Sequence, residues 1–143
     1  MPPLRPDLLA LVAARALGAL ATTKADGRPQ LSVVTYAWHP GDRLIKVSTT
    51  ERRAKVVNLR RDPRASLMVT SEDGWSYAVL EGFVELSATA REPDDDAVEA
   101  LVALYREVQG EHPDWEDYRE AMVRDGRLVM RLHVERVYGL VQG

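Results

Sequence analysis

The sequence contains no cysteine among its 143 residues. The chain can therefore form no disulfide, thiolate nucleophile or iron–sulfur cluster, and most structural zinc sites are excluded. Charged residues interrupt every apolar stretch before it reaches the roughly 20 residues that a membrane span requires. The N-terminus also lacks a basic segment followed by an apolar run and a cleavage site. We expect a cytoplasmic protein with no membrane partner.

Motifs typical of common catalytic sites are also missing. The chain has no GxGxxG, GxxxxGK[ST], GxSxG or HExxH pattern. Its histidines, His39, His112 and His133, are scattered, and none lies at helical spacing from a second metal ligand. The acidic run 94–96 stands where a helix is expected to begin, so helix capping is a better interpretation than cation binding. These patterns identify no catalytic residue and no metal site.

The composition that remains is typical of a globular protein, with 45% hydrophobic and 29% charged residues and a formal net charge of −3. We expect one domain covering residues 1–143. The charge is uneven, because residues 51–64 carry most of the clustered cations and residues 92–99 are acidic. A short basic segment in an acidic chain favours a small anionic ligand over a nucleic acid.

Hydrophobic periodicity and turn residues predict an α+β fold. Helices are expected at 7–16, 51–61, 94–108 and 114–124. Strands are expected at 17–23, 30–38, 44–48, 65–70, 75–87, 128–134 and 137–141. The first three strands should form a meander, and Gly82 should bend the fifth. Six or seven mostly antiparallel strands with flanking helices indicate a barrel-like sheet.

The segment 46–59 is the strongest candidate for a binding site. A strand ends in Ser48, Thr49 and Thr50, and either threonine can cap the next helix. Cations follow directly in the sequence, including Arg53 and Lys55. Cations at a helix start oppose its dipole, at a cost of about 0.3–1 kcal/mol each when exposed. A bound anion reverses that effect, because free amides, hydroxyls and cations together bind phosphate. A solvated basic helix face explains the same pattern equally well.

Three longer stretches carry a combined pattern over nearly the whole chain. They are 26–32 (Asp-Gly-Arg-Pro-Gln-Leu-Ser), 51–66 (beginning Glu-Arg-Arg-Ala-Lys) and 73–82 (beginning Asp-Gly-Trp-Ser-Tyr), and residues 94–96, 114–119 and 137–140 extend the pattern. In this order and spacing the chain resembles the pyridoxamine-phosphate-oxidase-like split-barrel superfamily of flavin and deazaflavin proteins. In combination the stretches look like the actinobacterial branch that uses the deazaflavin coenzyme F420. The resemblance implies a split β-barrel of the FMN-binding type.

Two departures from the superfamily pattern bear on the cofactor. The vitamin oxidases of this superfamily bind flavin mononucleotide (FMN) with an arginine and a lysine on the second strand, and Ser32 and Ala37 occupy those places here. Losing both cations weakens a clamp for a dianionic phosphate. Coenzyme F420 has a phosphodiester with a single charge and a polyglutamate tail, which the surplus arginines of 52–64 could bind. The resemblance and the charges together favour F420 over FMN.

The resemblance also implies which residues bind the cofactor. Lys55 is the first candidate for the phosphate or the ring system. The residues expected around the phosphate and its linker are Ser48, Thr49, Thr50, Arg53, Ala54 and Asn58. The second strand should line the deazaflavin ring with Gln30, Leu31, Ser32 and Val34. The partner subunit of a homodimer should complete the pocket with Trp75, Ser76 and Tyr77, although Trp75 could equally be a core aromatic residue.

The implied function is reduction of a small conjugated organic molecule by hydride transfer from reduced F420. The protein then supplies orientation, desolvation and electrostatics, which agrees with the lack of catalytic motifs. The proton could come from solvent, Arg53 or Lys55. An FMN-dependent oxidoreductase of the same fold and a non-catalytic cofactor or pigment carrier are the alternatives.

Overall fold

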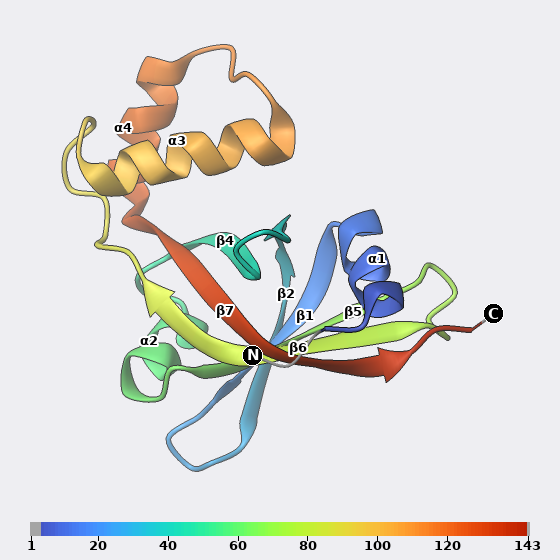
Figure 1. Cartoon of the computed structure of the whole chain (residues 1–143). Helices are drawn as coiled ribbons and strands as arrows, with labels where there is room; N and C mark the ends of the chain where they lie inside the picture. Colours follow the sequence, from blue (N-terminus) through green and yellow to red (C-terminus); the bar gives the residue numbers. More distant parts are fainter. Residues whose placement is uncertain (1–3, 143) are drawn as a thin grey trace.

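The computed structural model describes residues 4–142, and within them the chain forms seven strands and four helices (Figure 1). The elements follow one another as α1 (Pro6–Ala14), β1 (Leu17–Thr23), β2 (Pro29–Thr35), β3 (Ala37–His39), β4 (Leu44–Thr50), α2 (Ala54–Arg61), β5 (Arg64–Thr70), β6 (Tyr77–Leu86), α3 (Asp96–Gln109), α4 (Trp115–Asp125) and β7 (Arg127–Leu140). All strand pairs are antiparallel, in the order β2-β1-β5-β6-β7-β4-β3. The sheet curls into a split half-barrel, which confirms the predicted fold class.

The expected strand 30–38 is interrupted at Tyr36, so the predicted meander is wrong. The Tyr36 amide donates to the Ala16 carbonyl at 3.0 Å, and its buried hydroxyl donates to the Val12 carbonyl at 2.6 Å. The strand before this residue pairs with β1, and the strand after it pairs with β4. β2 and β3 therefore lie at opposite ends of the strand order, and the curl brings β2 into contact with β4.

β7 is one long strand, although two strands, 128–134 and 137–141, were expected. Its 14 residues pair with β4 along the first half and with β6 along nearly the whole length. The register shifts between Glu81 and Gly82 of β6, which confirms the predicted bend. This bulge lets β7 continue without a break while the sheet turns around the core.

The core has two parts. Alternating side chains of the strands fill the half-barrel, with Leu20, Leu67 and Leu80 almost fully buried, and α1 closes one end with Leu8 and Val12. The second cluster lies where α3 and α4 pack on each other and on β7. In Figure 1 these two helices sit together at one end of the sheet, away from α1. They form one wall of the site described below.

Side-chain caps begin both of these helices. Asp95 accepts a hydrogen bond from the Val98 amide at 2.9 Å, and the amides of Arg91 and Glu92 also donate to its carboxylate. These backbone hydrogen bonds lower the pKa of Asp95. Asp114 caps α4 through the Asp117 amide. The capping interpretation of the acidic run is confirmed.

Gly82→Ala should destabilise the fold, because a Cβ at this position would overlap the His133 carbonyl oxygen in the paired strand. We expect the free energy of unfolding in urea to fall by at least about 2 kcal/mol. Gly41→Ala is the matched control, since its Cβ meets no atom within 4 Å and its φ is not positive. Equal unfolding midpoints for the two variants would contradict this account of the bulge.

Candidate functional site

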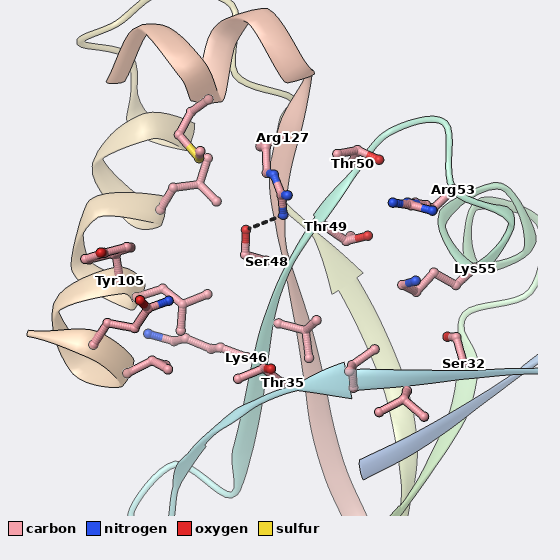
Figure 2. Close-up of a pocket in the computed structure, with 18 of the residues that line it drawn as sticks. Ser32, Thr35, Lys46, Ser48, Thr49, Thr50, Arg53, Lys55, Tyr105 and Arg127 are labelled. Atoms are coloured by element: carbon pink, nitrogen blue, oxygen red, sulfur yellow. Dashed lines mark hydrogen bonds between the residues drawn. The ribbon is translucent and has the colours of Figure 1, made fainter. Parts of the chain in front are cut away.

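A cavity of about 590 Å³ opens where β2, β4 and the start of β7 meet three of the helices (Figure 2). Its lining residues are Ser32, Val33, Val34, Thr35, Lys46, Val47, Ser48, Thr49, Thr50, Arg53, Lys55, Leu101, Leu104, Tyr105, Val108, Gln109, Tyr118, Met122 and Arg127. The floor comes from the half-barrel and one wall from α3 and α4. The break at Tyr36 creates this site, because it brings β2 against β4.

The cavity is positively charged. Four cations, Lys46, Arg53, Lys55 and Arg127, line it, and no carboxylate among residues 4–142 does. Within the described chain, no acidic group lies at ion-pair distance from the last three of these cations. Lys46 has a loose contact, 3.8 Å from the Glu107 carboxylate, which pairs more closely with His39 at 2.6 Å. An anionic ligand would supply the missing counter-charge.

The start of α2 differs from the expectation. The helix begins at Ala54, three residues later than predicted, and neither Thr49 nor Thr50 caps it. The Glu51 amide instead donates to the Gly126 carbonyl, and its side chain pairs with Arg91 at 3.0 Å. This extends β4 and holds residues 51–53 in a turn. No side chain caps α2, and the Val56 amide donates to the Arg53 carbonyl, so the amides of Ala54 and Lys55 are the ones at its start that remain available to an anion.

Burial and charge repulsion act together on Lys55. Desolvation lowers its pKa, and the neighbouring Arg53 lowers it further. A cation held next to another cation, without a carboxylate, is typical of a site prepared for an anion.

Strand β4 divides the cavity into two lobes, because successive side chains of a strand point to opposite faces. Figure 2 shows Ser32, Thr49, Arg53 and Lys55 on one side, which we call the α2 lobe. It shows Lys46, Ser48, Tyr105 and Arg127 on the other side, next to the helical wall, which we call the α3 lobe. One polar atom in each lobe, Ser32 Oγ and Arg127 Nε, is buried without a hydrogen-bond partner.

The structure brings half of the expected binding residues together. Ser32, Val34, Ser48, Thr49, Thr50, Arg53 and Lys55 all line the cavity. Gln30, Leu31, Ala54, Asn58, Trp75, Ser76 and Tyr77 lie outside its lining within this chain. Ala37 also lies outside, on β3, where it packs against the helical cluster.

Two of the residues outside the cavity belong to a buried network. The Asn58 amide donates to the Thr22 hydroxyl at 3.2 Å, and that hydroxyl donates to the Gln30 side chain at the same distance. The Arg61 side chain donates to the side-chain oxygen of Asn58 at 3.1 Å and to the backbone carbonyl of Thr23 at 2.7 Å. This network attaches α2 to β1 and so positions Lys55.

The loop between β5 and β6 carries Trp75, whose side chain is 72% exposed. A core position for this residue is therefore wrong. Ser76 is buried beside it, with its amide donating to the Ser71 hydroxyl and its own hydroxyl accepting from the Gln142 amide. Leu31 is also exposed, at 66%. The side chains of Trp75 and Leu31 thus both face away from the core of this chain.

Sequence reasoning missed the α3 lobe. Lys46 could have been found, because it lies two residues before Ser48 on a strand and must share its face. Arg127 gives no local signal, since only the pairing of β7 with β4 brings it to Ser48, to which it donates at 3.3 Å. No group of three metal-binding side chains occurs in the described chain, and none of its helices is long and apolar enough to span a membrane.

The sequence pattern of the pyridoxamine 5'-phosphate oxidase family matches residues 4–140, and the chain belongs to this family. The F420H(2)-dependent biliverdin reductase of Mycobacterium tuberculosis is 30% identical over 134 residues, which are 93% of this chain and 85% of that protein.

Solved structures with lower identity share the fold. An F420 reductase matches with a TM-score of 0.69 at 19% identity, covering 94% of this chain and 98% of that chain. A heme storage protein from Vibrio cholerae matches with a TM-score of 0.68 at 17% identity, covering 96% and 95%. The split barrel is thus common to relatives with different ligands.

Asn58→Ala should lower the free energy of unfolding by about 1–3 kcal/mol, because it leaves buried groups of the network without partners. Lys55→Ala, in the same helix, should leave stability within about 0.5 kcal/mol, since Lys55 has no partner to lose. Urea denaturation measures both. A large loss for Lys55→Ala with no loss for Asn58→Ala would contradict the division between anchoring and binding residues.

Proposed function

We propose that the chain is an F420-dependent oxidoreductase that reduces a small conjugated organic molecule. The observation that carries this proposal is the α2 lobe, where Arg53 and Lys55 lie without counter-ions beside Thr49 and an uncapped helix start. The 30% identity to an F420H(2)-dependent biliverdin reductase supports the choice of coenzyme.

The residues of the α2 lobe fit the phosphodiester of this coenzyme. Arg53 and Lys55 are cationic donors, and the Ser32 hydroxyl is a buried group that still needs a hydrogen-bond partner. The apolar side chain of Val34 on β2 gives the adjoining surface against which a planar ring can pack. The exposed arginines of α2 offer positive surface to the anionic tail.

The bound coenzyme supplies a hydride, and the protein supplies the environment. Arg53 and Lys55 hold the phosphate and so fix the position of the ring. The apolar wall of α3 and α4 keeps water from the substrate. Lys55 is a better proton donor than Arg53, because an ammonium group can lose its proton while a guanidinium stays protonated.

An FMN-dependent oxidoreductase of the same fold is the nearest alternative. Only one of the two positions used to argue against FMN, Ser32, lines the cavity. Arg127 and Lys46 are further cations of the cavity, but they lie in the other lobe. The α2 lobe therefore has the two cations of the helix start, Arg53 and Lys55, but the uncharged Ser32 on β2, so its grip on a dianionic phosphate is weaker than the one expected for the vitamin oxidases.

A carrier that binds a cofactor or pigment without turnover is the second alternative. The fold of a heme storage protein shows that the split barrel can serve storage. Incubation with reduced F420 and an electron acceptor separates the two functions. Oxidation of F420 that depends on the protein supports the enzyme, and binding without oxidation across a panel of quinones, tetrapyrroles and activated alkenes supports the carrier.

We also propose a homodimer, because the outer face of the sheet is apolar. The strand register places Val33, Ala19, Met68, Val79 and Tyr138 in one row across β2, β1, β5, β6 and β7. The first, third and last of these side chains are 74%, 42% and 48% exposed. A second copy is the occupant that fits, since its own apolar row would cover this one, and the resemblance to the family implies that its 75–77 loop completes the ring site.

Titration with F420 and FMN, followed by fluorescence, tests the cofactor assignment. The protein should bind F420 more tightly than FMN, and Lys55→Ala should weaken F420 binding at least about tenfold through loss of a charge-assisted hydrogen bond. Lys24→Ala is the control, because it removes a lysine that lies outside the cavity. Equal affinities of the two variants for F420, or tighter binding of FMN, would reject the assignment.

Light scattering at micromolar concentration should give twice the monomer mass of 16.0 kDa. Met68→Glu places a charge in the middle of the apolar row and should shift the protein toward monomer. Val57→Glu is the control, since it changes another exposed apolar residue, on α2. A monomeric wild type would reject the dimer.

A further inference from the structure

The α3 lobe is a second binding compartment with its own chemistry. Its wall consists of Leu101, Leu104 and Met122, which are largely buried, together with Val108 and the ring of Tyr105. The hydroxyl of the neighbouring Tyr118 already donates to the Leu101 carbonyl at 3.1 Å, so it is not free for a ligand. This side of the lobe therefore favours an apolar, planar body.

The opposite side of the same lobe is cationic. Arg127 donates one hydrogen bond, from Nη1 to the Ser48 hydroxyl at 3.3 Å, while its Nε is buried without a partner. Lys46 lies on the same face of β4, two residues from Ser48, with the carboxylate of Glu107 3.8 Å away. Figure 2 shows both cations on the side of Tyr105 and the helical wall.

A buried guanidinium nitrogen without a partner is costly unless a ligand satisfies it. The planar guanidinium matches a carboxylate in a two-pronged arrangement, which an ammonium group cannot provide. Polar atoms of the described chain do not complete this arrangement at Arg127. A carboxylate or a phosphate could supply the missing acceptor, and the apolar wall on the other side of the lobe favours a carboxylate carried by an otherwise apolar molecule.

We propose that the α3 lobe is the substrate site and that it selects a conjugated, apolar molecule carrying a carboxylate, with Arg127 as the principal recognition residue and Lys46 as its auxiliary. This inference rests on the proposed function, because it assigns the α2 lobe to the coenzyme. Strand β4 lies between the two lobes. The coenzyme and the substrate would therefore lie side by side, each held by the cations of its own lobe.

The probe for this site is 1-pyrenebutyrate, a planar apolar carboxylate, and 1-pyrenebutanol is its neutral counterpart. Fluorescence anisotropy of the wild-type protein without coenzyme should show about tenfold tighter binding of the carboxylate. Arg127→Gln should reduce this preference to about twofold, and Lys46→Gln should reduce it in part. Arg124→Gln is the control, since Arg124 lies on the exposed side of α4 beside Asp125.

Three results would overturn the proposal. The first is a wild type that binds both probes equally, and the second is a full preference retained by Arg127→Gln. The third concerns the coenzyme, whose tail also carries carboxylates. If Arg127→Gln weakens F420 binding as strongly as Lys55→Ala does, Arg127 recognises the tail and not a substrate.

The same measurements keep the two proposals separate. A protein that fails to bind F420 but prefers 1-pyrenebutyrate through Arg127 would reject the coenzyme and retain the carboxylate site. A protein that binds F420 but binds the two pyrene probes equally would retain the coenzyme and reject the carboxylate site. Circular dichroism checks that Arg127→Gln is folded, and Lys46→Gln provides an independent test because its side chain is not anchored to Ser48.

Discussion

The burial of Tyr36 is the constraint on which the rest of the structure depends. Its hydroxyl reaches the Val12 carbonyl of α1, and its amide reaches the Ala16 carbonyl just before β1. Burial raises the pKa of Tyr36 to about 12, so the hydroxyl stays a donor at all ordinary pH values. Because this residue leaves the ladder, the chain moves from one edge of the sheet to the other, and the curl of the sheet brings β2 against β4, which both line the cavity.

The charges outside the cavity explain why three of the four cations inside it are unpaired. Glu51 is held by Arg91, and Asp62 by Arg64, with the pKa of each carboxyl lowered by its arginine. Glu107 lies between His39, 2.6 Å from its Nε2, and the cavity cation Lys46, 3.8 Å from its Nζ. Acidic side chains near the site thus have other partners. The cavity thus stays cationic, and the repulsion between its unpaired cations costs stability, as is typical of binding sites.

The fold class could be predicted from the sequence because strand alternation, Gly82 and the turn residues are local signals. The break at Tyr36 could not, since it depends on a hydrogen bond to α1 and on the edge that β3 joins. The later start of α2 has a similar origin, because the Gly126 carbonyl that holds Glu51 is distant in sequence. Local propensity predicts an element well and its ends poorly when tertiary contacts set those ends.

The candidate site likewise has one part that could be predicted from the sequence and one part that could not. Residues of the segment 48–55 could be predicted because hydroxyls and cations are adjacent in the sequence and remain adjacent in space. Asn58 and Gln30 look like ligand-binding residues by type, yet their hydrogen bonds hold α2 to β1. Arg127 could not be found, because 79 residues separate it from its partner Ser48. Sheet topology, not spacing, creates the α3 lobe.

The crowding of Lys55 by Arg53 has a consequence for the heat of binding. Burial and, to a smaller extent, repulsion by Arg53 lower the pKa of Lys55 in the free protein, and an anion between the two cations offsets the repulsion and raises that pKa again. In alkaline buffers, ligand binding therefore takes up protons, and the affinity declines as pH rises. The enthalpy measured by calorimetry then includes the ionisation enthalpy of the buffer, so that two buffers at the same pH report different heats for one binding event.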